Sequence, residues 1–521
     1  MFDVLLKNAK LIDGTSSPWV YADIGVVGDT IAFIGKSGSQ QGKTTINAEG
    51  KFVCPGFIDA HTHLEIMPFL GDSLQDRLMQ GITTIIGGNC GQGVAPVRPC
   101  DVPGWSLQLG LDCSTYPWES FGEFAKYTQE TKPAINIMSM VPHGLLRYTV
   151  AGIENRILTD AELGTMCNIL QQSMEEGAAG LSTGLIFPPA MFAPSNELIE
   201  LCRVVAEFGG VFSVHLRNES YRLIESVREV LEIAQKSGVK LQISHHKVTG
   251  KANWGKIRAS LMLIEQARQQ GIDVMVDSYP YSFGANNFTS ILPPYLADKN
   301  VNQLRTVLMD KTQWPDIIQQ MTTDNSYENF WIQAESADNI ILFNVPSYPE
   351  LSSKSLQYVA DKWGMSPFEA AFKLICADGH AISSAYMTMW EEDVETVFKQ
   401  NFAMVGSDSF PVAPGCSSHP RHNRTFPRVL AYYCKEKGLV TLEEAVHKMT
   451  ALPARRFGIS KRGILALGQK ADIVVFDYHK LKDSELLQSG IESVLVNGEI
   501  ALLNGKFTEA YSGKFLLQQK K

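Results

Sequence analysis

Histidine, cysteine and aspartate residues recur where short apolar segments of the sequence end. His61 and His63 lie two residues apart after one such segment. Because side chains alternate along a strand, both point the same way and can share one metal ion. A His-x-His pair is a weak signal by itself, since most histidines have ordinary structural roles. Its meaning depends on what lies at the ends of the other segments.

Four more candidate residues follow apolar segments: Cys90 in Gly-Gly-Asn-Cys-Gly, His215 in Phe-Ser-Val-His-Leu-Arg, His245 in Ile-Ser-His-His-Lys and Asp408 in Val-Gly-Ser-Asp-Ser. Each has an ordinary interpretation in isolation, as a small buried hydrophobe, a hydrogen-bonding imidazole or a helix cap. A thiolate at Cys90 needs a positive neighbour, which a divalent metal ion provides. A donor set of imidazole, thiolate and carboxylate favours zinc over magnesium or calcium.

The elements that must position these residues form an alternating series from Gly56 onward, in which short apolar runs are separated by longer amphipathic stretches. This pattern is typical of βα units, and eight such units predict a (β/α)₈ barrel. The predicted strands are Gly56 to His61, Ile82 to Ile86, Ile135 to Val141, Gly180 to Gly184, Val211 to His215, Lys240 to His245, Asp273 to Ser278 and Ala403 to Ser407. The six candidates then fall at the ends of strands one, two, five, six and eight. Barrel enzymes place their catalytic groups there, so we expect the six to converge on one point.

Both ends of the chain have β character, with short strands and Gly- or Asn-bearing turns. Residues 1–54 and 455–521 are therefore predicted to build one small β-sandwich around a barrel domain of residues 55–454. The gap between the seventh and eighth barrel strands is long and contains Pro293-Pro294. We expect an insertion near 286–348 that caps the barrel mouth.

Composition excludes several classes of protein. The 521 residues carry a net charge of −9 with scattered basic residues, so nucleic acid is not an expected partner. No apolar stretch is long enough to predict a membrane span, and the first residues do not resemble a secretory signal. Nine cysteines without a Cys-x-x-Cys pair favour reduced thiols and a cytoplasmic location. The expected partner is a small-molecule substrate, and the oligomeric state stays open.

Several longer motifs resemble those of a known protein family. Pro-Gly-Phe-Ile-Asp-Ala-His-Thr-His at 55–63 resembles the opening of the amidohydrolase superfamily. Gly-Gly-Asn-Cys-Gly at 87–91, Ser-His-His-Lys at 244–247, Gly-Ser-Asp at 406–408 and His-Pro-Arg at 419–421 resemble the D-aminoacylases (N-acyl-D-amino-acid deacylases). The resemblance continues to Gly-Gln-Lys-Ala-Asp-Ile-Val at 468–474, so it covers nearly the whole chain.

This resemblance implies zinc-dependent hydrolysis of the amide bond of N-acyl-D-amino acids, which releases a carboxylate and a free D-amino acid. It implies that Cys90, His215 and His245 hold one tightly bound Zn²⁺ and that His61, His63 and Asp408 form a second, weaker site. Asp408 would also be the catalytic residue that accepts and returns a proton. The family pattern assigns the substrate carboxylate to Lys247, Tyr279, Tyr281 and Arg421, and the preference for D substrates rests on the resemblance alone.

Two alternatives compete with this interpretation. A cyclic-amide hydrolase, such as a hydantoinase or dihydroorotase, would carry a bridging lysine in strand four, but Gly180 to Leu185 contains none. A non-catalytic scaffold with the same fold would have lost metal ligands, whereas all six positions hold metal-competent residues. The sequence also departs from the family after His-Pro-Arg, where His422, Asn423 and Arg424 follow. An extra cation there would favour an acidic substrate side chain.

Overall fold

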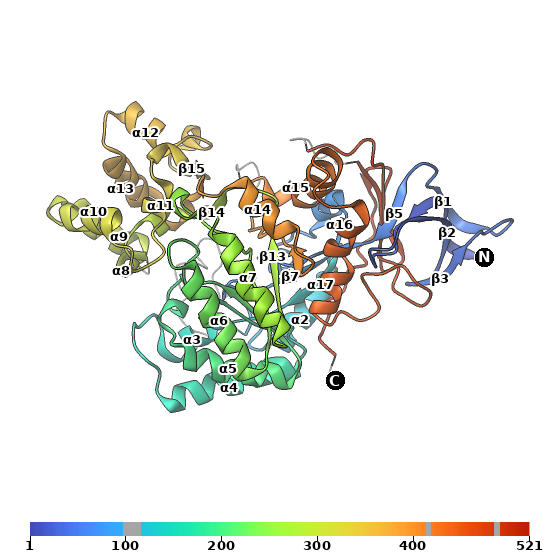
Figure 1. Cartoon of the computed structure of the whole chain (residues 1–521), viewed down its shortest axis with the longest axis horizontal. Helices are drawn as coiled ribbons and strands as arrows, with labels where there is room; N and C mark the ends of the chain where they lie inside the picture. Colours follow the sequence, from blue (N-terminus) through green and yellow to red (C-terminus); the bar gives the residue numbers. More distant parts are fainter. Residues whose placement is uncertain (97–115, 298, 413–417, 484–489, 520–521) are drawn as a thin grey trace.

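The chain, described here from a computed structural model for residues 1–96, 116–297, 299–412, 418–483 and 490–519, is built around a barrel of parallel strands (Figure 1). One hydrogen-bonded series runs β6-β7-β8 and another runs β9-β10-β11-β12-β13-β17. The strands are β6 (Phe57–Asp59), β7 (Ile82–Gly87), β8 (Asn136–Ser139), β9 (Val141–Pro142), β10 (Gly180–Gly184), β11 (Val211–His215), β12 (Lys240–Ile243), β13 (Val274–Ser278) and β17 (Ala403–Val405).

Two junctions close the two series into one barrel. Met140 alone separates β8 from β9, so these two form one interrupted strand. At the other junction the backbone N–H of Ala60 donates to the carbonyl of Val405 at 3.2 Å, and that of Asp408 donates to the carbonyl of His61 at 2.8 Å. The predicted (β/α)₈ fold is therefore confirmed, and the carboxyl ends of its strands meet at one mouth.

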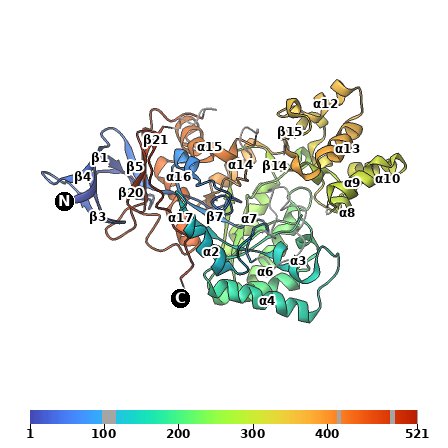
Figure 2. The same ribbon diagram turned by 180° about the vertical axis from the view of Figure 1, so that it is seen from behind.

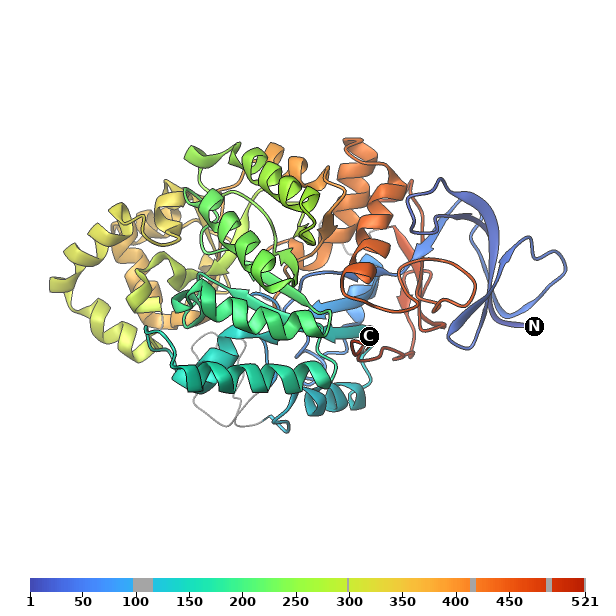
Figure 3. The same ribbon diagram turned by 60° about the horizontal axis from the view of Figure 1, so that its bottom comes forward.

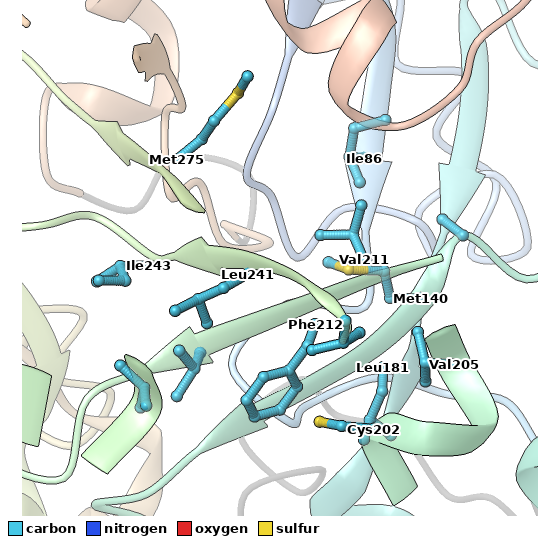
Figure 4. Close-up of a cluster of buried hydrophobic side chains, with 14 of the residues drawn as sticks. Ile86, Met140, Leu181, Cys202, Val205, Val211, Phe212, Leu241, Ile243 and Met275 are labelled. Atoms are coloured by element: carbon cyan, nitrogen blue, oxygen red, sulfur yellow. The ribbon is translucent and has the colours of Figure 1, made fainter. Parts of the chain in front are cut away.

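Helices surround the barrel (Figure 3), and the apolar side chains between them and the strands are buried. Leu181 on β10 and Phe212 on β11 belong to the same buried cluster as Cys202 and Val205 of the neighbouring helix α5 (Figure 4). The barrel helices are α2 (Phe121–Glu130), α3 (His143–Ala151), α4 (Asp160–Glu175), α5 (Ser195–Glu207), α6 (Leu223–Ser237), α7 (Lys256–Gln269) and α14 (Glu391–Phe398). They are followed after β17 by α15 (Arg421–Arg428), a π-helix (Val429–Glu436), α16 (Leu442–Met449) and α17 (Ala451–Arg456).

Strands from both ends of the chain form a second, nine-stranded sheet (Figure 2). In this sheet β5 pairs with β1 on one side and with β18 on the other, so residues 52–55 join the two halves. The sheet has its own buried core, to which Leu6, Ile24, Ile473 and Leu495 contribute. Its strands are β1 (Phe2–Leu11), β2 (Val20–Val27), β3 (Thr30–Gly35), β4 (Gly42–Asn47), β5 (Phe52–Pro55), β18 (Ile473–Phe476), β19 (Ile491–Val496), β20 (Glu499–Leu503) and β21 (Lys506–Phe507).

A buried polar network joins this sheet to the barrel. Asp472 accepts hydrogen bonds from the Arg462 guanidinium, from the Asn497 backbone N–H at 2.7 Å and from the Asn136 side chain on barrel strand β8 at 3.2 Å. The Arg462 and Asp472 side chains are each 5% exposed. The network therefore fixes the sheet against the barrel wall.

The change Asp472→Ala leaves the Arg462 guanidinium buried without its carboxylate, so we expect the free energy of unfolding to fall by about 3–5 kcal/mol. Denaturant unfolding measures this loss. Glu232→Ala, which breaks only an exposed pair with Lys236, is the control and costs under about 1 kcal/mol. Equal losses in the two variants would show that the network does not join the domains.

The insertion between β13 and α14 is longer than the predicted 286–348. It begins with β14 (Gly284–Asn287) and ends with β16 (Ser383–Tyr386), which pairs with β14 and with β15 (Ile340–Phe343). The return strand β16 must reach back to β14, and this moves the end of the insertion far beyond 348. Its helices are α8 (Pro294–Ala297), α9 (Val301–Met309), α10 (Trp314–Thr323), α11 (Phe330–Ala334), α12 (Leu356–Trp363) and α13 (Pro367–Asp378). It lies at the end of the molecule opposite the nine-stranded sheet (Figure 1).

The cysteines within the described ranges, which are Cys54, Cys90, Cys167, Cys202, Cys376 and Cys434, are free. Among the helices of the described residues, none has both the length and the apolar character needed to cross a bilayer.

Candidate metal centre

The structure brings all six predicted metal ligands to the carboxyl ends of the barrel strands. His61 and His63 follow β6, Cys90 follows β7, and Asp408 follows β17. His215 is the last residue of β11, whereas β12 ends at Ile243, so His245 lies beyond the strand that the sequence pattern predicted to contain it. All six side chains belong to buried residues.

The donor atoms of these residues surround a small volume centred near the Cys90 sulfur. Cys90 Sγ lies 3.4 Å from His61 Nε2, 3.4 Å from His245 Nε2 and 3.9 Å from His215 Nδ1. On the other side of His61, Asp408 Oδ1 lies 3.5 Å from His61 Nε2 and 3.3 Å from His63 Nε2. Ligand atoms of His61, Cys90, His245 and Asp408 all lie within 4.8 Å of one another.

This geometry and donor chemistry fit zinc. Bond lengths of about 2.0–2.3 Å place the ligand atoms of a tetrahedral zinc ion roughly 3.3–3.8 Å apart. The distances from Cys90 Sγ to His61 and His245 fall in this range, and the 3.9 Å to His215 lies just above it. Thiolate, imidazole and carboxylate are also the donors that zinc takes in proteins. Burial raises the pKa of the Cys90 thiol and nearby His61 only partly offsets this, so a thiolate there needs an added cation.

Unusual backbone conformations deliver three of these side chains. Cys90, His245 and Asp408 have positive φ values of 52°, 32° and 51°. A residue with a side chain rarely adopts the left-handed region, and such strain is tolerated where the surroundings fix it. The positive φ turns the chain out of the strand direction directly after β7, β12 and β17. The observed strands therefore end before these residues, and β12 ends before His245, which the sequence predicted it to include.

Asp277, which was not predicted from the sequence, orients the candidate ligands His61 and His245. Its Oδ1 accepts from His61 Nδ1 at 3.1 Å and from the His245 backbone N–H at 2.7 Å, while Oδ2 accepts from Gln242 at 2.8 Å. With its proton on Nδ1, the His61 ring presents the Nε2 lone pair to the site. Asp277 is next to last in β13, and its position near a strand end was the signal available in the sequence.

Asp408 is held as a carboxylate. Its Oδ2 lies 2.7 Å from Arg421 Nη1, and both side chains are buried. Burial raises the pKa of Asp408, but the Arg421 charge and the hydrogen bond from His63 outweigh burial, and the pKa lies well below its ordinary value. The group is therefore negatively charged, can accept a proton, and lies beside the candidate metal-binding atoms.

The four predicted substrate-binding residues do not form one cluster. The Tyr279 ring lies between two of the cations, with the Arg421 guanidinium 4.9 Å and the Lys247 ammonium 6.0 Å from its centre. Lys247 is paired with Glu219 at 2.7 Å. Tyr281 lies apart from these, and its hydroxyl donates to the carbonyl of Pro420 at 3.3 Å, directly before Arg421.

A cavity of about 940 Å³ opens beside the centre. Arg421 and Ser409 line it on the barrel side, Phe187 and Met191 line it after β10, and Asn286 with other residues of the insertion covers it. Of the predicted substrate-binding residues, only Arg421 is among its described lining. The insertion thus shapes the space through which a substrate reaches Asp408.

His422 does not add a cation to this cavity. It lines the wall, but Arg77 Nη2 lies 3.0 Å from His422 Nε2, where it donates to the ring. Burial and the Arg77 charge lower the pKa of His422 to about 3, so its imidazole is neutral near pH 7. The expected extra positive charge for an acidic substrate side chain is therefore absent at His422.

Comparisons with known proteins agree with this architecture. The model of the amidohydrolase family matches residues 44–284 and 368–502, and its gap coincides with most of the insertion. D-aminoacylase of Alcaligenes xylosoxydans xylosoxydans is 34% identical, over 99% of this chain and 97% of that protein. The crystal structure of N-acyl-D-glutamate deacylase from Bordetella bronchiseptica, complexed with zinc and a phosphonate mimic of the tetrahedral intermediate, is 33% identical with a TM-score of 0.83, and 99% of each chain is covered.

A solved D-aminoacylase is 32% identical with a TM-score of 0.83, and the match covers 100% of each chain. That enzyme has a binuclear metal centre, in which one metal activates and a second metal attenuates. Identity above 30% over nearly the entire length, together with the family match, is decisive for the family. The chain belongs to the amidohydrolase family, in the branch that contains the D-aminoacylases and N-acyl-D-glutamate deacylases.

Proposed function

We propose that this protein is a zinc-dependent hydrolase that cleaves the amide bond of N-acyl-D-amino acids to give a carboxylate and a free D-amino acid. The observation that carries the proposal is the convergence of the buried donors around Cys90 Sγ and Asp408, beside a cavity that Arg421 lines. The activities of the relatives supply the substrate class. Hydrolysis of N-acetyl-D-methionine and of its L enantiomer, followed by release of the free amine, tests it.

In this proposal Cys90, His215 and His245 hold a tightly bound zinc ion, and His61, His63 and Asp408 form a second, weaker site. Cys90 Sγ lies 3.4 Å from His245 Nε2 in the first ligand group and 3.4 Å from His61 Nε2 in the second. This supports a sulfur that is placed between the two groups. The binuclear centre of the solved D-aminoacylase supports two sites as well. Zinc held by these residues would polarise the scissile carbonyl and lower the pKa of a water molecule.

Asp408 carries out the proton transfers. Its low pKa keeps the group ionised, so the carboxylate is free to accept a proton from the attacking water, and Oδ1 faces the Nε2 atoms of His61 and His63. The same carboxyl group then returns the proton to the departing nitrogen of the amide, so that the amine leaves neutral. Arg421 fixes the carboxylate in place through Oδ2.

Arg421 is also the best-supported ligand for the carboxylate of the substrate. Its guanidinium has five N–H donors, of which Nη1 faces Asp408, and its planar fork matches a carboxylate. Tyr279 stacks under the guanidinium. The roles of Lys247 and Tyr281 in binding substrate stay predictions, and their partners in this structure are Glu219 and the Pro420 carbonyl.

Arg421→Ala is expected to raise the KM for N-acetyl-D-methionine about 10- to 100-fold, because a hydrogen bond to a charged group contributes about 1.5–3 kcal/mol. Steady-state kinetics with the free acid and its methyl ester separate this effect from the loss of the Asp408 pair. The wild type should strongly prefer the acid, and the variant should not. A variant that still prefers the acid as strongly would exclude Arg421 as the carboxylate ligand.

A further inference from the structure

Glu219 is a buried carboxylate in the loop that links β11 to α6, four residues after His215. Its Oε2 lies 3.5 Å from His215 Nε2, and its Oε1 lies 3.2 Å from His245 Nδ1. These are the ring nitrogens opposite those that face Cys90 Sγ, which are His215 Nδ1 and His245 Nε2. One carboxylate therefore spans the rear edges of two candidate zinc ligands.

The cluster of His215, Glu219 and His245 has donor atoms close enough together to suggest a metal site of its own. The ammonium group of Lys247 already occupies that position. Lys247 Nζ lies 2.7 Å from Glu219 Oε2, 2.8 Å from Oε1 and 2.7 Å from His245 Nδ1. A cation fixed at hydrogen-bond distance from these atoms leaves no room for a second one.

The surrounding structure fixes the position of Glu219. Its backbone N–H donates to Glu328 Oε2 at 2.8 Å, and its carbonyl accepts from the Thr249 backbone N–H at 2.9 Å. Glu328 belongs to the insertion, lies between α10 and α11, and is itself buried. The backbone that carries this carboxylate is therefore held in place by the barrel and the insertion together.

We propose that Glu219 is a positioning residue that orients the His215 ring for zinc. It accepts the N–H of that ring at Nε2, which leaves the lone pair of His215 Nδ1 directed at the site. His215 Nε2, a buried nitrogen that lacks a hydrogen-bond partner among the described residues, then has an acceptor once the ring turns slightly toward Oε2. The inference rests on the proposed zinc site.

Glu219→Gln tests it, because the amide keeps the shape of the side chain but offers one accepting oxygen instead of two. We expect zinc affinity, measured by competition with a chromophoric chelator, to fall about 10- to 100-fold. The visible absorption of the cobalt-substituted protein should change as well, since the ligand field depends on ring orientation. The thermal midpoint of the metal-free protein reports folding separately.

Glu197→Gln is the matched control. Glu197 is also buried between an imidazole and a cation, with Oε1 2.9 Å from His143 Nε2 and Oε2 2.9 Å from Arg147 Nη1, but it touches no candidate ligand. The Glu197→Gln variant should be less stable than the wild type but should keep the zinc affinity and the cobalt spectrum of the wild type. Unchanged affinity and spectrum in Glu219→Gln would overturn this inference alone. Failure of the wild type to bind zinc would overturn the proposed function with it.

Discussion

Asp408→Asn is expected to lower kcat for N-acetyl-D-methionine by about 10²–10⁴-fold, because the amide cannot accept a proton from water or return one to the departing amine. The asparagine fills the same volume, and its one oxygen can still accept from Arg421, which contacts a different oxygen of the aspartate than His63 does. We therefore expect the tightly bound zinc around Cys90 to be retained. Steady-state kinetics with parallel zinc analysis measure both quantities.

Asp393→Asn is the control for this variant. Asp393 is buried and accepts from the Gly255 backbone N–H at 2.9 Å, away from the metal centre. Its amide should leave kcat within a factor of about two of the wild type, since no reacting group depends on it. If Asp408→Asn keeps at least a tenth of wild-type kcat with full zinc content, Asp408 is not the proton-transfer group.

Cys90→Ala should remove the tightly bound zinc and, with it, nearly all activity. Partners that merely orient metal ligands contribute about 10- to 100-fold to affinity, and a ligand atom itself contributes more. Cys90 Sγ lies 3.4 Å from His61 Nε2 and 3.4 Å from His245 Nε2, so its loss opens the site on two sides. Elemental analysis of the purified variant and its turnover at saturating zinc give the result.

Cys202→Ala separates the ligand role from the packing role. Cys202 is as deeply buried as Cys90 but lies in the hydrophobic core on α5, where its sulfur contacts apolar side chains. The alanine should cost stability through a small cavity and leave zinc content and turnover intact. Stoichiometric zinc with normal turnover in Cys90→Ala would remove the sulfur from the proposed ligand set.

The barrel and the six ligand candidates were predictable from the sequence because the information is local. Each barrel strand is a short apolar run, and a histidine, cysteine or aspartate at its end marks the barrel mouth. The exact strand ends were not predictable. His245 follows Ser244 out of the strand through a positive φ, and no propensity rule requires that conformation of a histidine.

The residues that support the ligands were missed for a different reason. Asp277 acts on His61 across 216 positions of sequence, so only the closed barrel brings this pair together. Glu219 is only four residues from His215, but it lies in the loop after β11. A buried carboxylate in a loop belongs to no periodic sequence pattern from which it could be predicted. The end of the insertion was missed because β16 is defined by its pairing with β14, a long-range contact.

Zinc titration of the metal-free enzyme, with hydrolysis of N-acetyl-D-methionine and N-acetyl-L-methionine followed at each point, tests the central claim most directly. The account predicts no turnover without metal, full turnover of the D substrate near one zinc per chain, and little or no turnover of the L substrate. Turnover of the D substrate that is independent of zinc, or a zinc-loaded enzyme that hydrolyses neither enantiomer, would contradict it.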